Sequence, residues 1–138
     1  MGSRQATTGG GARSRIPAWI PPQESAWIPP QTVKRYEVRW VSLDPVQGAE
    51  MAKTRPAVIV SLDALNQHLQ TVTICPLTTQ LHPAWRTRLG CRVGGRSAEI
   101  AVDQIRTVSK ARLGRKLGTL SNEEARDLRR LITEMYGE

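Results

Sequence analysis

The sequence predicts an α+β domain in which a small, curled, barrel-like β-sheet is followed by one amphipathic helix. Two patterns carry this prediction. Short apolar or alternating segments, separated by turn residues, fill residues 35–108, and an apolar repeat of helical spacing lies near the C-terminus. Strands that precede a terminal helix are typical of α+β folds, because the helix covers one face of the sheet. The 138 residues suit one domain and are few for two.

The first predicted strand is RYEVRWVSL at residues 35–43. Val38 and Trp40 fall on one side, and the apolar phase then shifts at Val41, which predicts a strand with a bulge. DPVQGAEMAKT at 44–54 follows as a loop of eleven residues that opens with an Asp-Pro turn signal. Loops of this length in small domains are often functional.

The second predicted strand, RPAVIVS at residues 55–61, is a continuous apolar run of the kind that is buried on both faces. The remaining elements of the sheet region are predicted in this order: one or two helical turns at 62–69, a strand at 71–77, a loop at 78–85, a strand at 86–93, a turn at Gly94 and Gly95, and one or two strands at 98–108.

The C-terminal helix has the clearest local signal. Ser121 followed by Glu124 forms a capping box, in which each residue satisfies a backbone N–H of the first turn. Apolar residues then recur at helical spacing and predict a face that packs on the sheet: Ala125, Leu128, Leu131, Ile132 and Met135.

Residues 1–32 are predicted to be a disordered, Pro/Gly-rich extension that precedes a single folded domain at 33–138. The sequence AWIPPQ occurs twice, at 18–23 and 26–31, and each proline pair favours polyproline II over helix or sheet. Such a segment is either a disordered appendage or a short ligand for the aromatic groove of another protein.

Net charge favours a polyanionic partner, nucleic acid above all, because the chain carries +8 with a pI near 10.5. Residues 1–35 hold half of this excess, with five basic residues and one acidic residue. No apolar run approaches the ~20 residues of a membrane span, and no signal-peptide core is present, so a cytoplasmic location is expected. Cys75 and Cys91 have no metal-site spacing and are expected to be reduced and buried.

Several reactive side chains fall at predicted strand ends or in the loops beside them: Arg55, Thr78, Asp103 and Glu50. An arginine suits phosphate oxygens, a threonine hydroxyl can bind a non-bridging oxygen, and a carboxylate can accept a proton from a ribose 2′-OH. Such a set fits phosphodiester transfer without a metal ion. The alternative is an ordinary salt bridge from Arg55 to Asp103 or Glu50. His68 is expected to be structural or exposed, and no P-loop, GxSxG or HExxH motif is present.

Over roughly residues 33–138 the chain resembles the MazF/PemK family of toxins. KRYEVRWVSLDPVQGAEMAKTRPAVIVSLDALNQHLQTVTICPLTTQLHP matches the family's KRGEIWWV-like strand, LDPxxGxE, KTRPxxIVS and PLTT motifs in order. AEIAVDQIRTVSKARLGRKLGTLSNEEARDLRRLI matches its DQIRTxDKxRL segment, its Gly-Xaa-Leu-Ser turn and its final helix. An ordered series of motifs is much more specific than any one of them.

This resemblance implies an SH3-like curled β-barrel with added helices, the fold shared by MazF, PemK and CcdB. It implies a homodimeric, sequence-specific endoribonuclease that cleaves single-stranded mRNA as the toxin of a toxin–antitoxin system, and a cognate antitoxin that suppresses it. Cleavage in this family proceeds through the 2′-OH, needs no metal ion or other cofactor, and leaves a 2′,3′-cyclic phosphate and a 5′-hydroxyl.

The resemblance also implies roles for individual residues. Arg55 matches the catalytic arginine of the TRP motif, and Thr78 matches the catalytic Thr or Ser that follows the PL pair. Asp103 falls where one plasmid-borne branch uses a catalytic aspartate, and the loop at 44–54 matches a loop that contacts RNA. The expected substrate-binding residues are Glu50, Lys53, Thr79, Gln80, His82, Arg86 and Gln104, although His82 also fits a simple surface position.

The chain departs from the family pattern at a few positions. Tyr36 replaces the usual glycine of the first strand, Ala101 replaces an arginine beside the aspartate, Ala49 replaces a histidine of some members, and Thr79 replaces a frequent serine. Val33 stands where members normally begin, so residues 1–32 are expected to be upstream sequence or a cloning remnant. Intact-mass analysis of the native protein tests this expectation, and a full-length mass would rule it out.

Two alternatives have a different function. One is a CcdB-like toxin that poisons DNA gyrase, but the chain ends in EMYGE and lacks the aromatic Trp-Gly-Ile ending of such toxins. The other is a catalytically silent member that binds RNA or antitoxin without cleavage. Incubation with RNA and, separately, with gyrase and DNA would distinguish them.

Overall fold

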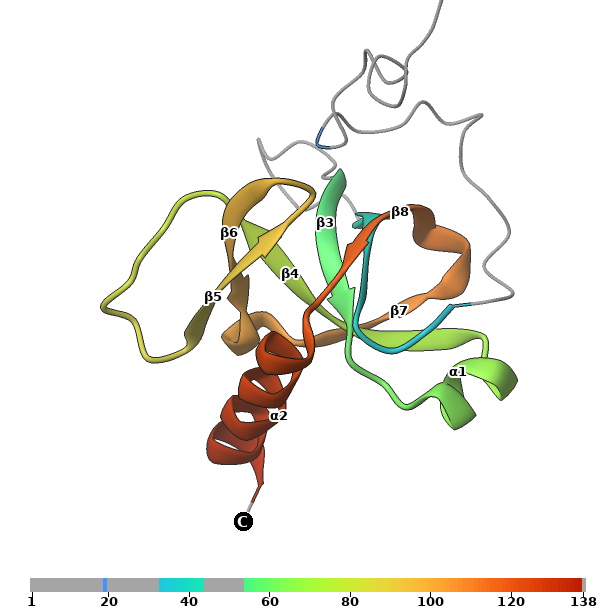
Figure 1. The fold of residues 1–138 in the computed structure, drawn as a ribbon. Coiled ribbons are helices and arrows are strands. Elements are labelled where there is room, and N and C mark those ends of the chain that lie inside the picture. Colours follow the sequence, from blue (N-terminus) through green and yellow to red (C-terminus); the bar gives the residue numbers. More distant parts are fainter. Residues whose placement is uncertain (1–18, 20–32, 44–53, 138) are drawn as a thin grey trace, which may run out of the picture.

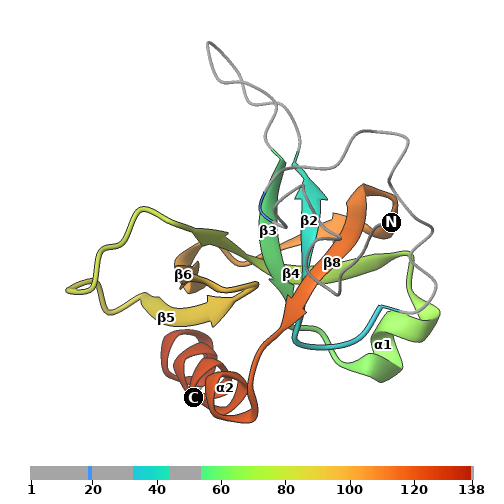
Figure 2. The same ribbon diagram turned by 45° about the horizontal axis from the view of Figure 1, so that its top comes forward.

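A computed structural model describes Trp19, residues 33–43 and residues 54–137. Seven strands in these residues form one curled antiparallel sheet in the order β5-β6-β4-β3-β2-β8, with β7 paired to β4 (Figures 1 and 2). The elements are β2 (Glu37–Ser42), β3 (Thr54–Ile59), α1 (Asp63–His68), β4 (Thr71–Thr78), β5 (Arg88–Val93), β6 (Arg96–Ala101), η3 (Val102–Gln104), β7 (Arg106–Ser109), η4 (Lys110–Arg112), β8 (Leu113–Thr119) and α2 (Asn122–Tyr136).

Strand β4 is the centre about which the sheet curls. Its first four residues pair with β7, from Thr71 opposite Ser109 to Ile74 opposite Arg106. Ile74 to Pro76 pair with β3 on one side, and Leu77 and Thr78 pair with β6 on the other. This change of partner turns one sheet into a half-barrel and confirms the predicted curled α+β fold.

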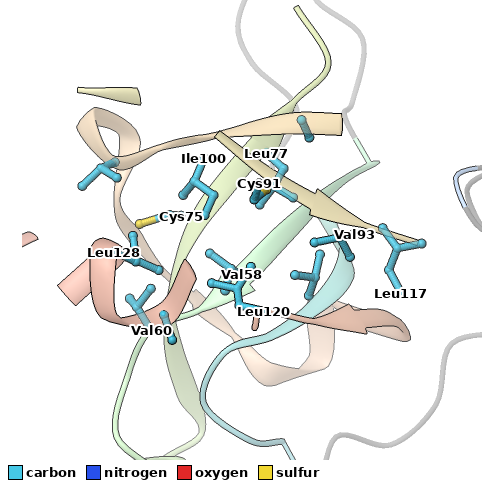
Figure 3. Close-up of a cluster of buried hydrophobic side chains, with 14 of the residues drawn as sticks. Val58, Val60, Cys75, Leu77, Cys91, Val93, Ile100, Leu117, Leu120 and Leu128 are labelled. Atoms are coloured by element: carbon cyan, nitrogen blue, oxygen red, sulfur yellow. The ribbon is translucent and has the colours of Figure 1, made fainter. Parts of the chain in front are cut away.

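The two faces of the sheet bury separate apolar clusters. Along β3, Val58 faces one cluster, whereas Ala57 and Ile59 face the other, so the prediction of a strand buried on both faces is confirmed. The larger cluster lies between the sheet and α2, and its members include the residues labelled in Figure 3: Val58, Val60, Cys75, Leu77, Cys91, Val93, Ile100, Leu117, Leu120 and Leu128. Both cysteines are free and buried, as predicted.

Helix α2 begins as the sequence predicts. The Glu124 N–H donates to Ser121 Oγ at 3.0 Å, and the Ser121 N–H donates to Glu124 Oε1 at 2.8 Å. The five predicted apolar residues all contribute to the larger cluster, and Leu128 is fully buried. None of the helices in the described part of the chain is long and apolar enough to cross a membrane.

Strand β8 is an element that the sequence reading missed. Its segment, LGRKLGT, contains two glycines, which weaken a strand pattern. The structure explains Gly118, because a Cβ atom there would lie 2.7 Å from Val93 Cγ1 of β5. The register shifts between β8 and β2 near Arg39 place the extra residues in β8, whereas β2 pairs with β3 without a break. The bulge predicted in the first strand is therefore wrong: Trp40 and Val41 are both buried because each face of β2 meets an apolar cluster. Strand β5 begins at Arg88, two residues later than predicted.

Tyr36 occupies a backbone conformation that favours glycine, with φ of 74°. This conformation explains why the family pattern has glycine at the position of Tyr36. Two contacts hold the strained residue: its N–H donates to Ile59 O at 2.7 Å, and its hydroxyl accepts from Arg129 Nη1 at 3.1 Å. Tyr36, which departs from the family pattern, therefore lies near α2, and these two hydrogen bonds stabilise its unfavourable backbone conformation.

Candidate active site

Arg55 and Thr78 come together at one end of β3 and β4. The antiparallel register pairs Ala57 with Pro76, and its continuation by two residues brings Arg55 opposite Thr78. Pro56 restricts Arg55 to an extended backbone, and this strand geometry leaves its side chain exposed. Both residues line two neighbouring cavities, so they form a wall that the cavities share.

The salt-bridge alternative for Arg55 fails for Asp103. Asp103 Oδ1 instead accepts from Arg88 Nε at 3.1 Å, and none of the described residues forms an ion pair with Arg55. The other predicted partner, Glu50, lies outside the described residues, as does Lys53. Among described residues the Arg55 guanidinium is therefore an exposed cation beside a threonine hydroxyl, which suits an anionic ligand.

The first cavity, here called the Trp85 cavity, has a volume of about 350 Å³. Besides Arg55 and Thr78 it is lined by three side chains that the resemblance predicts to bind substrate, Gln80, His82 and Gln104, and by Trp85. The His82 and Trp85 rings stack at 3.9 Å between centroids, with an angle of 10° between planes. Amide groups beside an aromatic stack are the kind of surface that holds an unpaired nucleobase.

The wall of the Trp85 cavity is anchored to the sheet at two points. The Arg88 guanidinium lies 4.6 Å from the Trp85 ring centroid, and its ion pair with Asp103 fixes it there. The His82 N–H donates to Glu99 Oε1 at 2.8 Å, and Glu99 on β6 is only 5% exposed. The aromatic stack in the loop between β4 and β5 is therefore held before any ligand arrives.

The second cavity, here called the Trp19 cavity, has a volume of about 420 Å³. Beyond the shared wall it is lined by Thr79, Trp40, Arg96 and Trp19. Trp19 Nε1 donates to Val93 O at 3.1 Å, and the ring meets Trp40 edge-on at 6.4 Å. The Arg96 guanidinium lies 5.5 Å from the Trp19 ring centroid. A residue far from the strands in sequence thus completes this cavity.

Further contacts define the positions of Thr78, Gln80 and Arg86. Thr78 Oγ1 accepts from the Gln80 N–H at 3.0 Å, which leaves the hydroxyl hydrogen available for a ligand. Arg86 pairs with Glu134 at 3.0 Å, and its side chain is 86% exposed. Arg86 and Asp103 line neither cavity. The structure therefore brings Arg55 and Thr78 together and leaves Asp103 behind the Trp85 wall.

Sequence reasoning did not identify Trp85, Arg88, Trp19 and Arg96 as site residues, although all of them line the cavities. The segment PAWRTR, in which an aromatic residue stands among basic ones, was a usable signal for the first two, because this pattern is typical of nucleic-acid surfaces. Nothing local in the sequence indicates that Trp19 and Arg96 meet.

Neither cysteine is a candidate nucleophile. Burial raises the pKa of the Cys75 thiol to about 12, and the negative charge of Asp103 adds to the effect. Burial likewise raises the pKa of Cys91 to about 12, with smaller contributions from Glu124 and Glu99. A thiolate is needed for attack, so both side chains are inert near neutral pH. Among the described residues no three His, Cys, Asp or Glu side chains gather as metal ligands.

Comparison with known proteins gives a consistent family. Residues 34–136 match the model of the PemK-like, MazF-like toxin of type II toxin–antitoxin systems. The chain is 30% identical over 113 residues to the endoribonuclease MazF of Staphylococcus saprophyticus, an alignment that covers 76% of this chain and 92% of that protein.

Solved structures agree in fold. A mycobacterial endoribonuclease in complex with its cognate antitoxin has a TM-score of 0.63 and 23% identity, covering 76% of this chain and 95% of that chain. MazF in a MazE–MazF complex from Deinococcus radiodurans has a TM-score of 0.67 and 19% identity, covering 77% and 96%. By its family match and its curated relative, the chain belongs to the PemK/MazF family of toxins of type II toxin–antitoxin systems.

Proposed function

We propose that this endoribonuclease toxin cleaves single-stranded mRNA at specific sequences, without a metal ion, by attack of a ribose 2′-OH. Family membership and the identity to an endoribonuclease support the activity. The observation that carries the site is the exposed Arg55 guanidinium beside Thr78, on a wall that two cavities share. A rigid strand end holds the cation, as transition-state stabilisation requires.

In the proposed step the 2′-oxygen bonds to the neighbouring phosphorus, and the bond from phosphorus to the 5′-oxygen breaks. The products are a 2′,3′-cyclic phosphate and a 5′-hydroxyl, so the 2′-OH proton leaves and the 5′-oxygen gains one. Arg55 neutralises the charge of the phosphorane and is our candidate donor to the leaving oxygen. Thr78 donates to a non-bridging oxygen.

The base that accepts the 2′-OH proton is either Asp103 or Glu50. Asp103 is already paired with Arg88, so its role as base requires that substrate displace or share that contact. Glu50 belongs to the predicted RNA-binding loop. The two variants Asp103→Asn and Glu50→Gln assign the role, because only the variant of the base should lose the acidic limb of the pH–rate profile.

The proposed partners are single-stranded RNA, a cognate antitoxin and a second copy of the chain, in the cytoplasm. Antitoxin complexes among the structural neighbours support the second of these. The gyrase alternative has less support, because the Tyr136 hydroxyl at the end of α2 donates to Val102 O at 3.0 Å and so is tied to the sheet.

The test is digestion of a long RNA of mixed sequence in EDTA, followed by mapping of the chain ends. We expect 5′-hydroxyl ends and cyclic phosphates at a restricted set of sequences. Intact RNA, or 5′-phosphate ends, would contradict the proposal. A parallel incubation with gyrase and DNA should leave gyrase active.

A further inference from the structure

The Trp85 cavity and the Trp19 cavity meet at the shared wall. Four residues line both of them: Arg55, Leu77, Thr78 and Gln80. Their outer walls are different, since His82, Trp85 and Gln104 line only the first, and Trp19, Thr79 and Arg96 line only the second. The candidate phosphate-binding pair therefore lies between two separate cavities.

Size and chemistry fit one nucleoside in each cavity. Volumes of about 350 and 420 Å³ lie at the small end of the range for ligand pockets, which is roughly 300–1,000 Å³. Each cavity has an indole and at least one side chain that can hydrogen-bond a base edge. Single-stranded RNA is read by this combination of stacking and edge contacts.

A phosphodiester joins two consecutive nucleosides. If Arg55 and Thr78 bind that phosphate, the nucleosides on its two sides extend away from the shared wall in different directions, and a cavity lies on each side. We infer that the Trp85 cavity and the Trp19 cavity are nucleoside subsites on opposite sides of the cleaved bond. This inference rests on the proposed function of Arg55 and Thr78.

The two subsites present different chemistry to a base. Gln80 lines both subsites, but Gln104 lines only the Trp85 subsite, where its amide can donate and accept, so this side can discriminate between base edges. In the Trp19 subsite, Arg96 and the two indoles dominate, and planar cations and indoles stack on any base. We therefore expect the sharper base preference on the Trp85 side of the cut.

The test compares Trp85→Ala with Trp19→Ala. The base frequencies on both sides of the cut are measured in RNA of mixed sequence, and the affinity is measured for a 2′-deoxy oligonucleotide that cannot be cleaved. We expect each variant to weaken oligonucleotide binding by about tenfold, the scale of one lost stacking contact. We expect the two variants to change base frequencies on opposite sides of the cut.

Matched controls make the comparison specific. Trp27→Ala changes the equivalent tryptophan of the second AWIPPQ repeat and should behave as wild type. Trp85→Tyr keeps an aromatic wall and should recover most of the binding lost in Trp85→Ala. Three results would overturn the inference: a shift on the same side of the cut in both variants, no change in either, or tighter binding by Trp19→Ala, which would show that Trp19 covers the site.

Failure of the inference can be told apart from failure of the proposed function. Suppose that the wild type binds the oligonucleotide and the two tryptophan variants bind it more weakly, as expected, but the wild type cuts no RNA. The subsites then stand and the nuclease proposal fails. If RNA is cut in EDTA while both tryptophan variants cut and bind as wild type, the nuclease proposal stands and the subsites fail.

Discussion

The two cavities beside Arg55 and Thr78 are built in different ways. The Trp85 wall is held by the sheet itself, through the Arg88–Asp103 ion pair and the buried acceptor Glu99. The Trp19 wall is contributed by a residue that precedes the domain, held by one hydrogen bond to Val93 and by ring contacts. One side of the site is therefore part of the folded domain, whereas the other depends on a second segment of chain.

The largest expected effect is on the wall that both cavities share. Arg55→Ala should reduce cleavage at least a hundredfold, because it removes a donor used in the transition state, and oligonucleotide binding should fall much less. Arg55→Lys is the control, since it keeps the charge but loses the planar fork of the guanidinium. Its cleavage rate should lie between those of the wild type and Arg55→Ala. Single-turnover cleavage measures both, and equal rates for wild type and Arg55→Ala would defeat the assignment.

A smaller effect should separate the two walls by their stability. Arg88→Ala leaves Asp103 unpaired, and because Arg88 is 8% exposed we expect a loss of about 1–3 kcal/mol in the free energy of unfolding. Arg96→Ala removes the equivalent guanidinium from the exposed Trp19 side and should change stability by less than about 0.5 kcal/mol. Urea denaturation compares them. Equal losses would show that the walls do not differ in rigidity.

The smallest effect concerns the thiols of the larger cluster. With a pKa of about 12, Cys75 and Cys91 should resist a thiol reagent at pH 8 in the wild type and equally in Trp19→Ala. A raised thiol pKa stabilises the fold below the unfolded value of 9, and that stability is lost as pH rises from about 9 to 12. Faster thiol labelling in Trp19→Ala would contradict this expectation and would mean that Trp19 helps to keep water out of the larger apolar cluster.

The sequence was sufficient for most of the fold because its strands and helix carry strong local patterns. RPAVIVS predicts burial on both faces, and the Ser121–Glu124 capping box predicts the start of α2. Strand β8 was missed because its two glycines weaken the strand pattern, and one of them, Gly118, is required by close packing on Val93, a contact between strands that are distant in sequence.

The candidate site was predictable only in part. The positions of Arg55 and Thr78 follow from the strand ends, and the antiparallel register brings them together. The partner of Asp103 was not predictable, because Arg88 reaches it across β5 and η3. The docking of Trp19 beside Trp40 and Arg96 was equally inaccessible, since no local pattern encodes a contact across the chain. The predicted extension at 1–32 stays a prediction apart from Trp19.

The most direct measurement is a structure of the full chain with an uncleavable 2′-deoxy oligonucleotide. We predict one phosphate within hydrogen-bond distance of both the Arg55 guanidinium and the Thr78 hydroxyl, with the preceding and following bases in different cavities. A phosphate bound elsewhere, or both bases on the same side of Arg55, would contradict the central claim.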